Sequence, residues 1–143
     1  MNALQMILDR QRELQKKHYG VDVTTLSEEE RAQYIRDMSL ALTDELHEAL
    51  NEVGWKPWAT SRHLNRQAYL GELIDVLHFW CNLVLIANTS EQELLDMYFA
   101  KADKNAKRQM EGYDGVRDKC TTCGRAFDDA AVLCTPVACE HIE

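Results

Sequence analysis

The sequence offers little from which to build a β-sheet or a membrane span. It has only two prolines and six glycines among its 143 residues, and its apolar residues recur at helical rather than alternating spacing. No uninterrupted apolar run approaches the roughly 18 to 20 residues of a transmembrane helix. The N-terminal stretch MNALQMILDRQRELQ is amphipathic and charged, unlike a signal peptide. We therefore expect an all-α, cytoplasmic protein with no membrane partner.

Positive charge is scarce as well. The chain has 16 lysine and arginine residues against 24 acidic ones, which gives a formal net charge of −8. Domains that wrap nucleic acid are usually basic, so we expect no nucleic-acid polymer as a partner. In the cytoplasm, the five cysteines are expected to be reduced.

Helical spacing and end signals predict four helices before residue 115. Ser27 and Glu30 form a capping box at the start of the second helix, and Gly54 and Gly112 are expected to end the second and fourth helices. The helices are expected at about residues 4–19, 28–53, 64–88 and 91–111. The sequence thus predicts an antiparallel helical bundle over residues 1–115 and a small Cys-rich module over residues 116–143.

Two pairs of acids stand out by their surroundings: Glu45 with Glu48, and Glu72 with Asp75. The same spacing recurs elsewhere in the chain, so spacing alone identifies nothing. However, Glu72 and Asp75 are the only full charges between residues 67 and 90, and charges on so apolar a helix are costly to bury unless they are paired or bind a metal. Packing of the second helix on the third would bring four carboxylates together, a donor set that suits Mg²⁺ or Mn²⁺ rather than zinc. The alternative is a solvated acidic face paired with Arg and Lys.

Several motifs in this order resemble the all-α nucleotide pyrophosphohydrolases, which include MazG-like enzymes and dimeric dUTPases. ELHE (45–48) and ELID (72–75) match the E-x-x-E and E-x-x-D signature, and DVLHFW, GWKPW and YFAKADKNAKRQMEGY match the dimeric dUTPase branch. The resemblance covers about residues 1–115. It implies Mg²⁺-dependent hydrolysis of a deoxynucleoside triphosphate, dUTP above others, to the monophosphate and pyrophosphate. It also implies a homodimer in the cytoplasm of a bacterial cell or phage-infected host.

The resemblance further implies roles for individual residues. Glu45 is expected to orient the attacking water and take its proton, with Glu48 as the second choice, while the signature carboxylates hold the metal. A basic helical face with an amide donor suits phosphate oxygens, although a solvated face is the alternative. The residues expected to bind phosphate are Lys56, Lys101, Asn105 and Arg108.

The base and sugar pocket is the least defined part of the prediction. In the family, first-helix amides in a pattern close to Q-x-x-L-N recognise uracil, and QRELQ supplies Gln11 and Gln15, with glutamine in place of asparagine. Trp58 either stacks on the base or plugs the end of the helical core. His78 either supports the site or is a core residue, and Asn82 continues the stripe of Glu72 and Asp75. Because these residues do not determine which base the pocket accepts, dCTP and purine dNTPs are alternative substrates.

The C-terminal segment contains four cysteines within 20 residues. Cys120, Cys123 and Cys134, with Cys139 or His141 as the fourth ligand, provide the N and S donors of a tetrahedral zinc site. A redox or disulfide role and uncommitted thiols are the alternatives. The segment is not part of the usual dUTPase pattern. A third functional hypothesis is therefore a non-catalytic binding module whose zinc tail contacts a partner.

Overall fold

The chain is all-α, as predicted, apart from two short strands near its C-terminus. The computed structural model describes residues 2–128 and, as backbone, residues 132–134 and 139–141. By its contacts the chain divides into two units, Met1–Leu94 and Leu95–Glu143. The elements are α1 (Ala3–Leu14), a π-helical turn (Gln15–Tyr19), α2 (Glu28–Asn51), α3 (Arg66–Ile86), α4 (Glu91–Met110), β1 (Val132–Cys134) and β2 (Cys139–His141).

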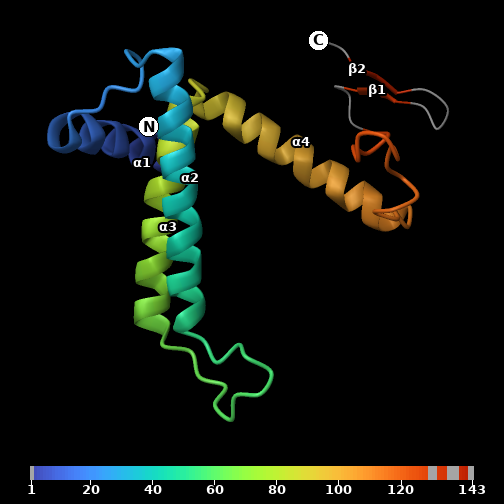
Figure 1. The fold of residues 1–143 in the computed structure, drawn as a ribbon, viewed down its shortest axis with the longest axis horizontal. Helices are drawn as coiled ribbons and strands as arrows, with labels where there is room; N and C mark the ends of the chain where they lie inside the picture. Colours follow the sequence, from blue (N-terminus) through green and yellow to red (C-terminus); the bar gives the residue numbers. More distant parts are fainter. Residues whose placement is uncertain (1, 129–131, 135–138, 142–143) are drawn as a thin grey trace. The chain divides into compact units, whose positions relative to one another are not determined.

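α2 and α3 form a long helical hairpin in the first unit, and α1 packs against α3 (Figure 1). The predicted capping box starts α2: the Ser27 hydroxyl accepts from the Glu30 amide at 3.3 Å, and the Glu30 carboxylate accepts from the Ser27 amide at 2.8 Å. Arg31 donates to the Ile86 carbonyl at 2.7 Å, which satisfies one of the unpaired carbonyls at the end of α3. These end contacts align the two helices.

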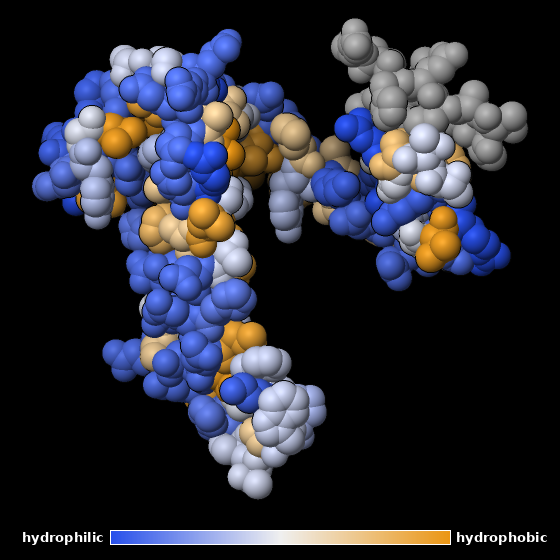
Figure 2. All heavy atoms as spheres, in the orientation of Figure 1, coloured by the Kyte–Doolittle hydropathy of each residue, from blue (hydrophilic) through white to orange (hydrophobic). Residues whose placement is uncertain are grey.

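The core of the first unit lies around the C-terminal half of α3. Its buried members are Leu8, Val23, Cys81, Val84, Leu85 and Ile86. The N-terminal half of α3 stays more open, with Leu70 41% and Ile74 53% exposed. Figure 2 shows such apolar side chains at the surface along the α2–α3 pair, between hydrophilic ones.

By length and composition α3 is apolar enough to cross a membrane, a property it shares with core helices of soluble proteins. Glu72 and Asp75 interrupt its apolar surface. The expectation that the protein has no membrane partner stays a prediction.

A loop over residues 52–65 joins α2 to α3 and is held by backbone contacts. Val53 and Leu64 form an antiparallel bridge. Gly54 approaches the other side of the loop so closely that a Cβ atom there would lie 2.4 Å from the Ser61 carbonyl oxygen. Arg62 donates to the carbonyls of the opposing segment at 2.8–3.2 Å. Gly54 is therefore required by this close approach, and α2 ends three residues before it, at Asn51.

The second unit contains most of α4 and the Cys-rich segment. Gly112 follows the helix with a φ of +68°, a left-handed conformation that glycine adopts without strain, so the predicted end of α4 is confirmed. β1 and β2 pair antiparallel. The division by contacts after Leu94 lies one helix before the predicted domain boundary at residues 115/116. The two-domain division at residues 115/116 stays a prediction.

Candidate active site

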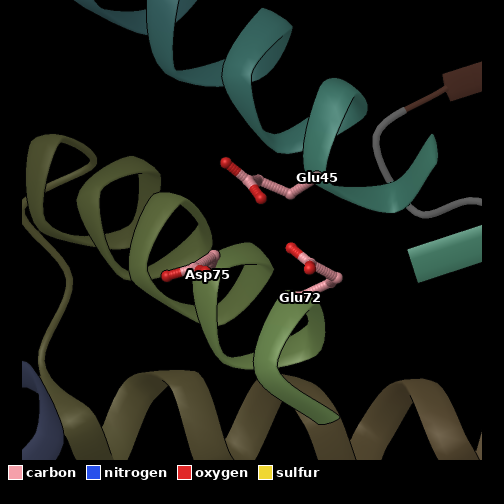
Figure 3. A group of neighbouring side chains, drawn as sticks. All are labelled: Glu45, Glu72 and Asp75. Atoms are coloured by element: carbon pink, nitrogen blue, oxygen red, sulfur yellow. The ribbon is translucent and has the colours of Figure 1, made fainter. Parts of the chain in front are cut away.

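Three carboxylates converge between α2 and the first half of α3. One carboxylate oxygen from each of Glu45, Glu72 and Asp75 lies within 4.8 Å of the other two. Figure 3 shows the Glu45 carboxylate on α2 facing those of Glu72 and Asp75 on α3. Glu72 and Asp75 are three residues apart and so project from the same side of the helix. The two helices thus bring together three of the four acids that the sequence singled out.

These carboxylates repel one another, and no lysine or arginine of the described residues forms an ion pair with them. Within the part of the chain that the structure describes, none of them forms a salt bridge, so the alternative of an acidic face paired with Arg and Lys is wrong for these three. Burial, and then the charges of Glu48, Asp75 and Glu72, raise the pKa of Glu45. Oxygen donors without cysteine or histidine suit a hard divalent cation such as Mg²⁺ or Mn²⁺.

Glu48 lies at the edge of this group rather than inside it. Its side chain is exposed, and it is outside the set of oxygens that lie within 4.8 Å of one another. The same spacing of three residues thus has different outcomes on the two helices: Glu72 and Asp75 both join the group, whereas of Glu45 and Glu48 only Glu45 does. Three of the four expected carboxylates therefore form this group. Glu48 lies near enough for its charge to raise the pKa of Glu45, and its role as a metal ligand stays a prediction.

A polar network lies further along α3, next to α1. The Gln11 amide donates to the Asn82 side-chain oxygen at 2.8 Å, and its own oxygen lies 2.6 Å from Nδ1 of His78. Because an amide oxygen only accepts, Nδ1 of His78 carries the proton. Asn82 in turn donates to the Met38 sulfur at 3.2 Å. Gln11 and Asn82 are 3% and 2% exposed, so their amide orientations are fixed by these bonds.

Gln11 and His78 also line a largely apolar cleft between α1 and α3. Its volume is about 340 Å³. The lining residues are Met6, Ile7, Arg10, Gln11, Ile74, Leu77, His78 and Cys81. The cleft follows the helix that carries the carboxylates, since Ile74 adjoins Asp75 in sequence and His78 is one turn beyond it.

Gln15, the other amide predicted to recognise the base, lies in the π-helical turn. It is 9% exposed, and its side-chain oxygen accepts from the Tyr34 hydroxyl at 3.3 Å. Burial raises the pKa of Tyr34 to about 12, so the hydroxyl remains a donor at neutral pH. Gln15 is thus held by α2, apart from the hydrogen bonds that join Gln11, His78 and Asn82.

Trp58 and Lys56 lie on the loop between α2 and α3. Trp58 is 77% and Trp55 47% exposed, so the interpretation that these tryptophans plug the core is wrong. Figure 1 shows this loop at the end of the α2–α3 pair away from α1, so Trp58 does not join Gln11 in one pocket of this chain. The Lys56 ammonium lies 6.0 Å from the centre of the Trp55 ring and is exposed.

The other residues predicted to bind phosphate lie on α4. Lys101 and Asn105 are exposed. Arg108 is engaged by Asp128: its Nε donates to the carboxylate at 2.8 Å and Nη2 to the second oxygen, while its guanidinium stacks 4.5 Å from the centre of the Tyr113 ring. Arg108 also lines a cleft of about 300 Å³. The phosphate role of these residues stays a prediction.

The predicted zinc ligands belong to the second unit. Cys120 is 5% exposed, and Cys123 packs against it. Cys134 is the last residue of β1, and Cys139 and His141 are the first and last of β2. The side chains of Cys134, Cys139 and His141 lie outside the described residues.

Sequence reasoning missed residues that hold the site in place. The helical pattern marks Tyr34 and Met38 only as core positions, yet both bond to the amides. Arg10 lines the cleft beside Gln11, and Arg62 organises the α2–α3 loop. Periodicity identifies the buried face of a helix but not which buried polar group each residue will contact, so no signal in the sequence marked these four.

Comparison with known proteins identifies the family. A family model described as dUTPase matches residues 3–90. The matched range contains α1, α2 and α3, and therefore the three carboxylates and the amide network. No curated protein matches the chain, and neither does any solved structure. Because the family model covers more than half of the chain, the protein belongs to the dUTPase family.

Proposed function

We propose that the protein hydrolyses dUTP to dUMP and pyrophosphate in a reaction that requires Mg²⁺ or Mn²⁺. Membership of the dUTPase family supports deoxynucleoside triphosphate pyrophosphohydrolase activity in general. The single observation that carries the proposal is the order of groups along α3. The carboxylates of Glu72 and Asp75, with Glu45 opposite, are followed by the amide network at His78 and Asn82.

The spacing along α3 suits a nucleoside triphosphate. Seven residues separate Asp75 from Asn82, which corresponds to about 10 Å of helix. Phosphates bound at the carboxylates would therefore leave the base one to two helical turns away, at the cleft that Gln11 and His78 line. One helix thus sets the distance between the reacting phosphates and the group that recognises the base.

Glu45, Glu72 and Asp75 would hold the metal through carboxylate oxygens. When bound, Mg²⁺ would neutralise the triphosphate and lower the pKa of the attacking water. Glu45 is the proposed general base, because it alone of the three comes from α2 and faces the other two across the gap. Burial and the neighbouring carboxylates raise its pKa, which favours acceptance of a proton from water.

Uracil selectivity is proposed to come from the fixed orientation of Gln11. An amide has one donor and one acceptor side, and a freely rotating glutamine would pair with uracil or cytosine alike, because the two bases differ at position 4 in presenting an acceptor or a donor. His78 and Asn82 remove that freedom.

Lys56, Lys101, Asn105 and Arg108 are proposed to bind the phosphates, a role that rests on the family resemblance. For Arg108 this requires an exchange, because its guanidinium already binds the Asp128 carboxylate. Carboxylate and phosphate use the same planar fork of donors. A nucleotide phosphate would therefore compete directly with Asp128.

A cytoplasmic homodimer is the proposed assembly. A helix that is apolar on most of its surface is normally buried, yet Leu70 and Ile74 of α3 are 41% and 53% exposed, as is Leu46 of α2 at 45%. A second copy of the chain, packed on the α2–α3 pair, would cover exposed apolar side chains such as these. Such a partner would also lie next to the carboxylates on the same two helices.

A panel of nucleotides tests the substrate. Pyrophosphate release should be measured with dUTP, dCTP, dTTP, dATP, dGTP and UTP, each with Mg²⁺ and with chelator. We expect turnover of dUTP to exceed that of the other pyrimidines by well over about tenfold and to stop without metal. Equal turnover across the bases would instead support a broad dNTP pyrophosphohydrolase, and no turnover of any nucleotide would support a non-catalytic binding module.

A further inference from the structure

The segment from Asp118 to Phe127 folds into a tight turn around two cysteines. Lys119 and Ala126 form an antiparallel bridge, the Cys120 amide donates to the Arg125 carbonyl, and the Gly124 amide donates to the Cys120 carbonyl, both at 2.8 Å. Gly124 has a φ of +71°, a left-handed conformation that favours glycine. The turn therefore brings Cys120 and Cys123 to one side of a fixed backbone loop.

The second pair of cysteines lies on the following hairpin. β1 and β2 pair antiparallel, and the register sets Cys134 directly opposite Cys139, with His141 opposite Val132. Directly opposite residues have Cβ atoms about 4.5–5.5 Å apart, whereas diagonal neighbours are about 7–8 Å apart. Of the two candidate partners of Cys134, Cys139 therefore has the register position that a shared ligand site requires.

This segment lacks the means to fold by apolar burial. Its core in the described residues consists of Cys120, with Cys123 and Phe127 packed against it. Segments this short need a metal or a disulfide to hold a fixed structure. In a cytoplasmic protein, thiols stay reduced, and a Cys-x-x-Cys pair on a turn together with a Cys-x4-Cys pair on a hairpin can form a closed metal site instead.

We propose that Cys120, Cys123, Cys134 and Cys139 bind one structural zinc ion. Four thiolates at about 2.3 Å from a tetrahedral zinc would hold the turn and the hairpin together. Cys139 is assigned as the fourth ligand in preference to His141, because Cys139 lies directly opposite Cys134 and His141 lies opposite Val132. The site is separate in sequence and in donor type from the oxygen donors of Glu45, Glu72 and Asp75, which suit a hard cation.

The zinc module also fixes a contact of α4. Asp128 directly follows Phe127 of the turn and binds both Arg108 and the Lys104 ammonium, which donates to the Asp128 carbonyl at 2.8 Å. Loss of zinc would release the turn from its fixed structure and so weaken this contact. Zinc binding would therefore strengthen the ion pair between Arg108 and Asp128.

Metal analysis of the full-length protein, purified without chelator, tests the proposal. We expect about one zinc per chain in the unmodified protein, and less than about a tenth of that in Cys120→Ser and Cys139→Ser, because one missing thiolate opens a closed site. Two matched controls should keep full zinc: Cys81→Ala, which changes the fifth cysteine, buried in α3, and His141→Ala. Helical circular dichroism checks that the first unit stays folded in each variant.

Cobalt provides a second readout that does not depend on purification history. The chelator-treated, reduced chain should bind Co²⁺ with the intense thiolate-to-metal absorption of a four-sulfur site, and Cys139→Ser should lose it. The proposal is overturned if the full-length protein contains no zinc and gives no such absorption, or if its mass shows a disulfide. Loss of zinc in His141→Ala but not in Cys139→Ser would overturn the ligand assignment. Pyrophosphate release with Mg²⁺, measured in parallel, reports on the separate catalytic proposal.

Discussion

Replacement of Glu45 by glutamine separates the effect of the carboxylate cluster on stability from its role in metal binding and catalysis. The change keeps the size of the side chain and removes one of three charges whose oxygens lie within 4.8 Å of one another. It therefore removes the repulsion between Glu45 and each of Glu72 and Asp75, as well as that between Glu45 and Glu48. At this distance two unit charges repel by about 1 kcal/mol in a water-like medium and by about 3.5 kcal/mol at an effective dielectric constant of 20.

The lower repulsion energy, about 1 kcal/mol per pair, applies here. Asp75 is exposed and Glu45 and Glu72 are only half-buried, and solvent screens such charges. Without metal, Glu45→Gln should then stabilise the fold by about 1–2 kcal/mol, or about 3–6 °C in Tm for a domain of this size. The pKa of Glu45 is raised, so the native state takes up a proton more readily than the unfolded one. The unmodified protein therefore gains stability as pH falls, and the advantage of the variant should disappear below about pH 4.

Magnesium should reverse the order of the two proteins. At one hundred times its Kd, a ligand that binds only the native state adds about 2.7 kcal/mol, which the unmodified protein should gain and Glu45→Gln should not. Thermal unfolding with and without Mg²⁺, together with pyrophosphate release, measures both effects. Asp44→Asn is the matched control: it removes the same charge from an exposed neighbour outside the group and should keep both the Mg²⁺ response and turnover. If Glu45→Gln keeps the Mg²⁺ shift, the metal does not bind at this site.

Three further results are expected. Gln11→Ala should lower kcat/KM for dUTP by at least about 100-fold, since it removes an amide held by two hydrogen bonds, whereas Gln15→Asn, which keeps an amide, should lower it less. Steady-state kinetics with dUTP measure both effects, and equal losses would contradict the assignment. Leu70→Asp should shift the protein from dimer to monomer in sedimentation equilibrium, because it places a charge in the proposed interface, and an unchanged mass would place the interface elsewhere. Arg108 lowers the pKa of Asp128 to about 2, so the ionised pair stabilises residues 118–128 above about pH 4, and this stabilisation is lost as pH falls toward about 2. Hydrogen-exchange protection factors of residues 118–128, taken relative to the intrinsic exchange rate at each pH, should show this dependence, and Asp128→Asn should lack it.

Much of the helical framework follows from the sequence. The capping box at Ser27 fixes the start of α2, Ser90 accepts from the Glu93 amide at 3.1 Å before α4, and the charge-poor run around Glu72 and Asp75 marks α3 as the helix that carries the site. These signals are local, so a single sequence contains them. Their positions along the helices also predict that acids from α2 and α3 meet.

The remaining features depend on contacts that periodicity does not specify. Glu48 matches the same motif as Glu45, yet its side chain is exposed and outside the group of converging oxygens, although Glu72 and Asp75, with the same spacing, both belong to that group. Trp58 depends on the path of an irregular loop, and the pairing of Arg108 with Asp128 depends on the fold of a segment with almost no apolar core. In each case the outcome is set by tertiary geometry rather than by residue type and spacing.

Analysis of the products of dUTP hydrolysis tests the central claim most directly. The full-length protein should be incubated with dUTP and Mg²⁺, and the nucleotides and phosphates separated by ion-exchange chromatography. We predict dUMP and pyrophosphate in equal amounts from the unmodified protein, and neither from Glu45→Gln under the same conditions. Formation of dUDP and phosphate, or turnover by Glu45→Gln at the rate of the unmodified protein, would contradict the assignment of the reaction to the carboxylates of α2 and α3.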